Sequence, residues 1–125
     1  MKRDYQFIYT ILNYLSETKL PINTKDMNFV YFSADGTFEV SIKELAEHNF
    51  ILMKDVSTTH QPEWIITNIT SLGFDFLNLC NCEINQRILN AVASNYLPFA
   101  DFMQTLRLNA MNAFDEETKG LKNDL

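Results

Sequence analysis

Short sequence patterns in the middle of the chain predict, in order, a helix, two strands and a second helix. Asn49, a residue type that tolerates the left-handed conformation, follows the first helix. Residues 51–56 and 64–69 are rich in β-branched and aromatic side chains, and a polar stretch separates them as in a hairpin. Thr70 is a good N-cap for a helix over 71–80. This order predicts an α+β fold of the winged helix-turn-helix type.

Two interpretations remain open for residues 28–41. Asp35-Gly36 lies between β-rich runs and is a typical hairpin turn. Thr37, however, is a good N-cap for an amphipathic helix. We favour a strand over 29–32 followed by a helix over 38–48, with the hairpin as the alternative. The apolar face of that helix consists of Phe38, Ile42 and Leu45.

The remaining segments predict further helices. Asp4 can cap a helix that runs to about Thr18, and residues 23–27 suit one short turn. Residues 83–95 form another helix, and Pro98 suits the first turn of the last one. The side chains that we expect to point inward from the last three helices are Leu72, Phe76 and Leu79, then Ile84, Ile88, Leu89, Val92 and Ala93, then Phe99, Phe102, Met103, Leu106, Ala110, Ala113 and Phe114.

Length and composition indicate one domain. The chain has 125 residues, 46% of them hydrophobic, and its three glycines and three prolines are too dispersed to form a linker. We expect a single winged-helix-like domain with additional C-terminal helices over 1–114. Residues 115–125 read as a charged tail that frays.

The chain carries no targeting or membrane signal that we recognise. The first residues lack the apolar run and cleavage site of a signal peptide, and no hydrophobic stretch is long enough to span a bilayer. We therefore expect a cytoplasmic protein with no membrane partner. Cys80 and Cys82 are spaced C-x-C, which suits neither a zinc clamp nor a redox C-x-x-C, so they read as two reduced thiols.

The charge pattern argues against the usual DNA-binding role of this fold. The formal net charge is −6, whereas DNA affinity depends on neutralising phosphates. The predicted helix over 38–48 presents three carboxylates and one amine outward, and the hairpin tip has no Lys or Arg, with Lys54 the nearest. Direct DNA binding is therefore an alternative. The residues that would contact DNA are Lys43, Glu47, Ser57, Thr58 and His60.

Catalysis has little support in the sequence. No Cys or acidic residue is spaced to form a dyad with His48 or His60, which read as a capping and a surface histidine. No phosphate loop, H-E-x-x-H motif or metal-ligand cluster is present. We therefore expect a protein that is not an enzyme, with no catalytic residues, no cofactor and no metal.

The chain resembles a bacterial and phage family known as domain of unknown function 2513. Short motifs along nearly the whole chain carry the resemblance: Met1-Lys2-Arg3-Asp4, the segment from Ile42 to Ile51, Ile69-Thr70-Ser71-Leu72-Gly73-Phe74-Asp75-Phe76-Leu77, and Leu97-Pro98-Phe99. The resemblance implies a winged-helix fold and frequent carriage by phages or prophages. It implies no established activity.

The chain also departs from the family pattern. Ser71-Leu72-Gly73-Phe74 stands where family members tend to have Trp-Glu-Gly-His. Asn49 stands where a glycine usually follows the recognition-like helix. Ser41 stands where that helix usually has a histidine. These changes remove the polar family residues that would suggest chemistry.

A protein partner is the interpretation that we favour. The predicted recognition helix is acidic, and Leu108 and Met111 lie off the apolar stripe of the last helix, either as a second contact surface or as ordinary exposed residues. The last helices are also candidates for a homodimer contact. A narrower alternative is an acidic phage-encoded inhibitor of a host nucleic-acid-binding or defence protein. The candidate partner-binding residues are Glu39, Lys43, Glu44, Glu47, Leu108 and Met111.

Overall fold

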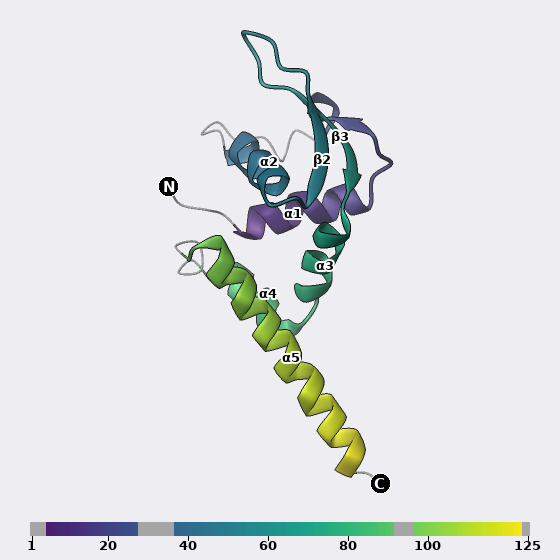
Figure 1. Ribbon diagram of the computed structural model, residues 1–125, viewed down its shortest axis with the longest axis vertical. Coiled ribbons are helices and arrows are strands. Elements are labelled where there is room, and N and C mark those ends of the chain that lie inside the picture. Colours follow the sequence, from purple (N-terminus) through teal and green to yellow (C-terminus); the bar gives the residue numbers. More distant parts are fainter. Residues whose placement is uncertain (1–4, 28–36, 92–96, 124–125) are drawn as a thin grey trace. The chain divides into compact units, whose positions relative to one another are not determined.

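A computed structural model describes residues 5–27, 37–91 and 97–123 (Figure 1). The chain divides into two compact units, residues 5–77 and residues 78–123, and each is described by itself. Five α-helices and a three-stranded antiparallel sheet make an α+β protein, as the sequence predicts. In chain order the elements are α1 (Tyr5–Ser16), β1 (Ile22–Asn23), η1 (Thr24–Asp26), α2 (Thr37–Glu47), β2 (Ile51–Asp55), β3 (Trp64–Ile69), α3 (Ser71–Leu79), α4 (Glu83–Asn90) and α5 (Phe99–Asn123).

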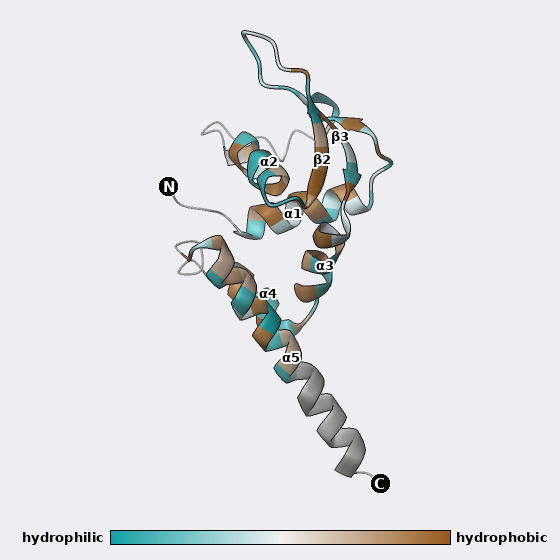
Figure 2. Ribbon diagram, viewed as in Figure 1, coloured by the Kyte–Doolittle hydropathy of each residue, from teal (hydrophilic) through white to brown (hydrophobic). Residues whose placement is uncertain are grey.

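Helix α1 supplies one wall of the core of the first unit. Its buried residues recur at helical spacing, as predicted, although the helix ends at Ser16 rather than near Thr18. Figure 2 shows polar and apolar residues sharing the turns of α1 and α2, as in amphipathic helices. The buried side chains of α1 are Tyr5, Ile8, Ile11, Leu12 and Leu15.

The sheet of the first unit has the order β1-β3-β2, so the last strand lies in the middle. Ile66 at its centre is fully buried and is opposite Ile22 of β1. The β2–β3 hairpin is confirmed, with Asp55 opposite Trp64 and an irregularity in register between Leu52 and Met53. The short turn predicted within 23–27 is the 3-10 helix η1.

Helix α2 is confirmed at Thr37–Glu47, against the predicted 38–48. Residues 37–47 therefore do not form the second strand of a hairpin, while the strand expected over 29–32 lies outside the described residues. Asn49 has a φ of 62°, as the αL prediction requires. The amide of Phe50 donates to Leu45 O at 2.9 Å and that of Asn49 to Ala46 O at 3.0 Å, which is the Schellman arrangement.

Helix α3 begins at the predicted cap and packs closely on the end of α2. The amide of Gly73 donates to Thr70 Oγ1 at 3.1 Å, and the amide of Thr70 donates to Phe50 O at 3.0 Å. A Cβ atom on Gly73 would lie 2.4 Å from Phe50 O, so glycine permits this approach. The inward position predicted for Leu72 is wrong: Leu72 is 49% exposed, because the close contact turns Gly73 and Phe76 inward instead.

Helix α4 is shorter than predicted and turns a polar residue inward. It ends at Asn90, where Ala91 has extended backbone angles, and not at residue 95. Ile84, expected inside, is 47% exposed, whereas Asn85 is fully buried. The Asn85 amide donates from Nδ2 to Leu79 O at 2.7 Å and to Leu106 O at 3.0 Å. These bonds satisfy the amide, and they fix which face of α4 points inward.

Helix α5 packs through the predicted Phe102, Met103 and Leu106, all of which are buried. Asn109 Nδ2 donates to Asn85 Oδ1 at 3.2 Å, so α4 and α5 share one polar contact. The helix continues to Asn123, so residues 115–123, expected as a fraying tail, are helical. The side chains of Ala113 and Phe114 lie outside the description.

Candidate functional site

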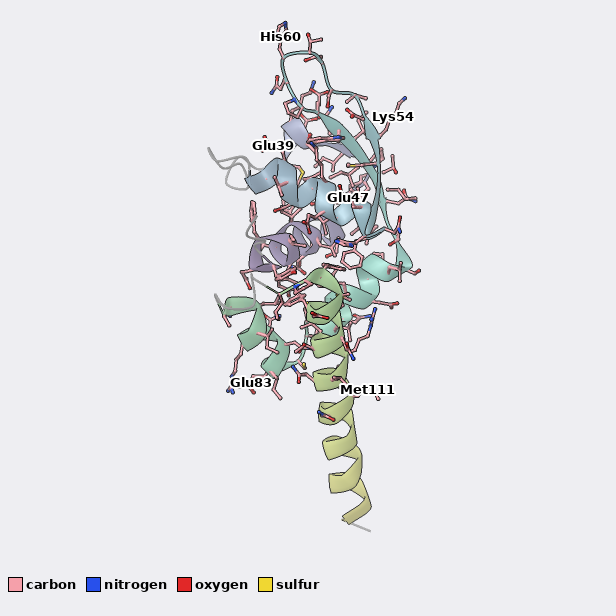
Figure 3. All side chains as sticks on the ribbon, turned by 60° about the vertical axis from the view of Figure 1, so that its left-hand side comes forward. Glu39, Glu47, Lys54, His60, Glu83 and Met111 are labelled. Atoms are coloured by element: carbon pink, nitrogen blue, oxygen red, sulfur yellow. The ribbon has the colours of Figure 1, made fainter. Side chains whose placement is uncertain are left out.

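The outward face of helix α2 follows from the side that it buries. Phe38, Ile42 and Leu45 point inward and are at most 1% exposed. This leaves Glu39, Lys43 and Glu47, spaced four residues apart, along one face of the helix. Figure 3 shows Glu39 and Glu47 on α2, with Lys54 and His60 on the hairpin.

Lys43 is the only basic residue of α2, and it lies against the sheet. Its Nζ is 5.9 Å from the centre of the Trp64 ring, which is 4% exposed. Asp55 is the cross-strand partner of Trp64 and is close enough to Lys43 to be affected by its charge. Hydrogen bonds from Ser57 lower the pKa of Asp55, and the charge of Lys43 lowers it further. The positive charge of Lys43 therefore faces an aromatic ring and a carboxylate of its own unit.

The carboxylates of α2 differ in their accessibility. Glu47 is exposed, whereas Glu39 is half-buried and has one carboxylate oxygen that is enclosed without a hydrogen bond among the described residues. Glu44 Oε2 lies 3.7 Å from His48 Nε2, with exposed side-chain fractions of 15% for Glu44 and 29% for His48. Glu47 is therefore the most available of the three.

The hairpin tip is closed by its own hydroxyl groups. Ser57 Oγ donates to Glu63 O at 3.1 Å and accepts from the Glu63 amide at 2.9 Å. Thr58 Oγ1 accepts from the amide of Gln61 at 3.2 Å. Ser57 and Thr58, proposed as DNA contacts, thus serve the turn, while His60 stands exposed at the tip (Figure 3).

The surface formed by α2 and the hairpin is acidic overall. Residues 37–64 contain five carboxylates against two lysines, Lys43 and Lys54. The tip from Ser57 to Glu63 contributes no Lys or Arg. A surface that contacts DNA phosphates needs the opposite balance.

Leu108 and Met111 belong to the other compact unit. They lie three residues apart on α5 and are 51% and 61% exposed, which makes them neighbours on one face of the helix. The candidate partner-binding residues therefore divide into an α2 group, within residues 5–77, and an α5 pair, within residues 78–123.

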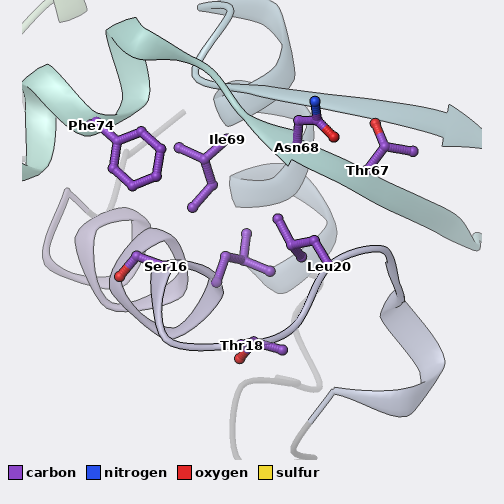
Figure 4. Close-up of a pocket in the computed structure, with 8 residues that line it drawn as sticks. Ser16, Thr18, Leu20, Thr67, Asn68, Ile69 and Phe74 are labelled. Atoms are coloured by element: carbon purple, nitrogen blue, oxygen red, sulfur yellow. The ribbon is translucent and has the colours of Figure 1, made fainter.

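A shallow groove of the first unit lies between the end of α1, strand β3 and helix α3 (Figure 4). Its volume is about 380 Å³, and its lining combines apolar side chains with hydroxyl and amide groups. Phe74 at one end of the groove is 48% exposed. The lining contains no titratable side chain, so it offers no acid, base or ion pair to a ligand. The lining residues are Leu15, Ser16, Thr18, Leu20, Thr67, Asn68, Ile69 and Phe74.

The two cysteines differ in their environment. Cys80 is fully buried, and burial, with a smaller contribution from Cys82, raises the pKa of its thiol to about 12. Cys82 is partly exposed, and both thiols are free. A thiol with such a pKa stays protonated near neutral pH and is a poor nucleophile. Among the described residues, no group of three or more His, Cys, Asp or Glu side chains is placed to bind a metal ion.

Sequence reasoning missed the contact between Lys43 and Trp64 and the burial of Asn85. The contact of Lys43 with Trp64 joins positions 21 residues apart, and no local pattern signals it. Asn85 is a polar residue in a helix that contains both polar and apolar residues. Its inward position follows only from its hydrogen bonds to Leu79 O and Leu106 O.

Comparison with protein-family models, with curated proteins and with solved structures found no match for the chain. Within the residues that the structure describes, no helix is both long and apolar enough to cross a membrane. The geometry and charge of the α2 and α5 surfaces are therefore the basis for a functional proposal.

Proposed function

We propose that this chain is a non-enzymatic binding protein that uses a winged-helix scaffold to contact a protein partner. The scaffold corresponds to residues 5–77. In support, a helix, a short strand, a second helix and a hairpin follow one another, and the sheet order β1-β3-β2 places the second hairpin strand in the centre. In this scheme α2 takes the place of the recognition helix and the tip around His60 takes the place of the wing.

The observation that carries the choice of partner is the position of Lys43. In a DNA-binding winged helix, basic side chains of this helix and of the wing neutralise phosphates. Here the one lysine of α2 is exposed but lies over Trp64 beside Asp55, and Glu47 is the other exposed charge of the same face. A carboxylate face suits a partner that presents basic side chains.

The partner class that this face fits is a protein with a basic surface. Host proteins that bind nucleic acid have such surfaces, and the resemblance to the phage-carried family makes an acidic inhibitor of one of them the narrower form of the proposal. Direct DNA recognition through Lys43, Glu47 and His60 is the competing function. The two functions predict opposite effects of charge reversal at Glu47.

The proposal is tested by affinity capture from a bacterial lysate with the full chain, followed by calorimetry with the purified captured protein. We expect one protein to bind the wild type, to be weakened roughly tenfold by Glu47→Lys, and to be released as salt rises. Asp75→Lys, which reverses an exposed carboxylate on α3, is the matched control and leaves binding unchanged. Equal binding of the Glu47→Lys variant and the control would remove α2 from the interface.

A further inference from the structure

The central strand β3 is paired unequally on its two sides. Strand β2 accompanies it along its whole length, whereas β1 accompanies it for two residues only, Ile22 and Asn23. On the β1 side, residues 67–69 of β3 therefore have no neighbouring strand within the described part of the chain. A strand directs the backbone N–H and C=O groups of alternate residues to each side, so part of this backbone is available for pairing.

The residue that precedes β1 prevents the ladder from continuing along β3. Pro21 would be opposite Thr67 if the β1–β3 register were extended by one residue. Proline has no backbone N–H and cannot donate to a ladder. Among the residues that the structure describes, no backbone hydrogen bond joins residues 17–20 to residues 67–69. The chain before β1 therefore leaves this stretch of the β3 edge open.

The groove of about 380 Å³ lies along the open stretch (Figure 4). Residues 67–69 line one side of it, and the end of α1 with the segment up to Leu20 lines the other. Phe74, which is half exposed, adds an aromatic surface at one end. Three residues of a strand extend about 10 Å, so the groove has room for about three to four residues of an extended chain.

The charge of the groove differs from that of the other edge of the sheet. The polar groups that line the groove are hydroxyls and amides, such as those of Thr18 and Asn68. Strand β2, at the other edge, exposes Lys54 and Asp55. Charged side chains on an edge strand discourage the addition of another strand. The groove instead favours a segment without charged side chains, since its lining offers a buried charge no partner.

We propose that the groove binds an extended, uncharged segment of a partner protein, which adds to the sheet as a strand beside residues 67–69 and in line with β1. Backbone hydrogen bonds to β3 supply affinity, and an apolar side chain of the segment contacts Phe74. So short a segment makes few contacts, and its dissociation constant is on the order of 100 µM. This site uses none of the α2 residues, so it stands or falls separately from the function proposed above.

Phage display of random seven-residue peptides against the full chain supplies a probe, and NMR of the ¹⁵N-labelled chain locates it. We expect the enriched peptides to lack charged residues. A synthetic copy of one should shift the backbone amide signals of residues 67–69. Methylation of single backbone nitrogens in that peptide should weaken binding about tenfold at alternate positions and leave it unchanged at the positions between, because every second amide of a strand faces its neighbour.

A matched pair of variants tests the open edge itself. Asn68→Lys places a charge in the groove and should weaken binding of the synthetic peptide about tenfold. Gln61→Lys changes an exposed amide side chain to lysine at the hairpin tip and should have no effect. Fluorescence of Trp64 establishes that both variants keep the fold.

Four results would overturn the proposal. The selection could enrich no peptides, or only charged ones. The shifted amides could lie away from residues 67–69, which would place the binding elsewhere. Methylation could weaken binding equally at every position, which would exclude strand addition. Hydrogen exchange of the free chain could show the three amides of residues 67–69 to be equally protected, in which case this chain or a second copy already covers the edge.

Discussion

Helices α2 and α5 each present charged residues outward, but they use those charges in different ways. On α2 the single lysine lies over Trp64, and Glu44 lies near His48, which directly follows the helix. On α5 the exposed Arg107 stands beside the half-exposed Leu108 and Met111. Both helices therefore expose a cation, but Lys43 on α2 has an aromatic ring and the Asp55 carboxylate beside it, whereas Arg107 on α5 lies next to an exposed apolar pair. Whether a charge is available depends on its neighbours in the fold and not on its position in a helical pattern.

Helices α2 and α5 are held in place by different contacts. The end of α2 is fixed by the backbone contact of Phe50 with Gly73, where the absence of a side chain permits the approach. Helix α5 is fixed by the buried amide of Asn85. A single substitution is enough to disrupt either contact.

The largest effect is expected for Gly73→Ala. The added methyl group would lie 2.4 Å from Phe50 O and 2.7 Å from Ile69 Cγ2, and backbone atoms cannot move aside cheaply. We expect the free energy of unfolding to fall by about 3 kcal/mol, measured by urea titration of Trp64 fluorescence, since Trp64 is the only tryptophan. Leu72→Ala, at an exposed position of the same helix, changes it by less than about 0.5 kcal/mol. An unchanged stability of Gly73→Ala would refute the close contact.

The next largest effect is expected for Asn85→Ala. The substitution leaves the carbonyl of Leu79 without its amide partner and removes the bond to Asn109, at a cost of about 2 kcal/mol. In a Cys82→Ser background, the labelling rate of the buried Cys80 reports how often this unit opens. We expect the rate to rise roughly 30-fold. Asn90→Ala, on the exposed end of α4, is the control, and equal rates for both variants would contradict the role of Asn85.

A pH titration probes the burial of Cys80 in the same unit. The thiol ionises near its ordinary pKa of 9.0 in the unfolded chain and at about 12 in the folded one. Below pH 9 the thiol is protonated in both states and has no effect, whereas between pH 9 and 12 ionisation favours the unfolded state. At pH 10 this lowers the free energy of unfolding by about 1.4 kcal/mol. Cys80→Ala removes that part of the decline, and an identical slope in both proteins would show that the thiol is not buried.

The smallest effect is expected for Lys43→Ala. Loss of the ammonium group over the Trp64 ring costs about 0.5 kcal/mol at this exposed site. Urea titration monitored by Trp64 fluorescence measures the change, and Lys54→Ala serves as the control on the neighbouring strand. A stability increase in Lys43→Ala would mean that the lysine is directed away from the ring.

The elements that sequence reasoning found are those with local signals. Asn49 and Thr70 mark helix ends through conformations and hydrogen bonds that involve only nearby residues, so the order of α2, the hairpin and α3 could be predicted. The inward face of α3 could not, because the side that points inward is set by the contact of Gly73 with Phe50, 23 residues away in the chain.

The same distinction applies to the candidate surfaces. The acidic character of α2 is visible in the sequence, but the contact of Lys43 with Trp64 depends on how the helix meets the sheet. Helix α4 ends at Asn90 without a glycine or proline to mark the end, so its length was overestimated. The inward position of Asn85 could not be predicted, because its hydrogen-bond partners come from α5 and from the end of α3.

The central claim is that the α2 face does not serve DNA, and fluorescence anisotropy with random-sequence duplex DNA tests it most directly. The titration is carried out with the full chain at about 50 mM and about 200 mM salt. We predict no saturable binding at either concentration, since Lys43 lies against Trp64 and the rest of the face is acidic. Tight binding at the lower concentration that weakens at least a hundredfold at the higher one, and that Lys43→Ala abolishes, would contradict the account.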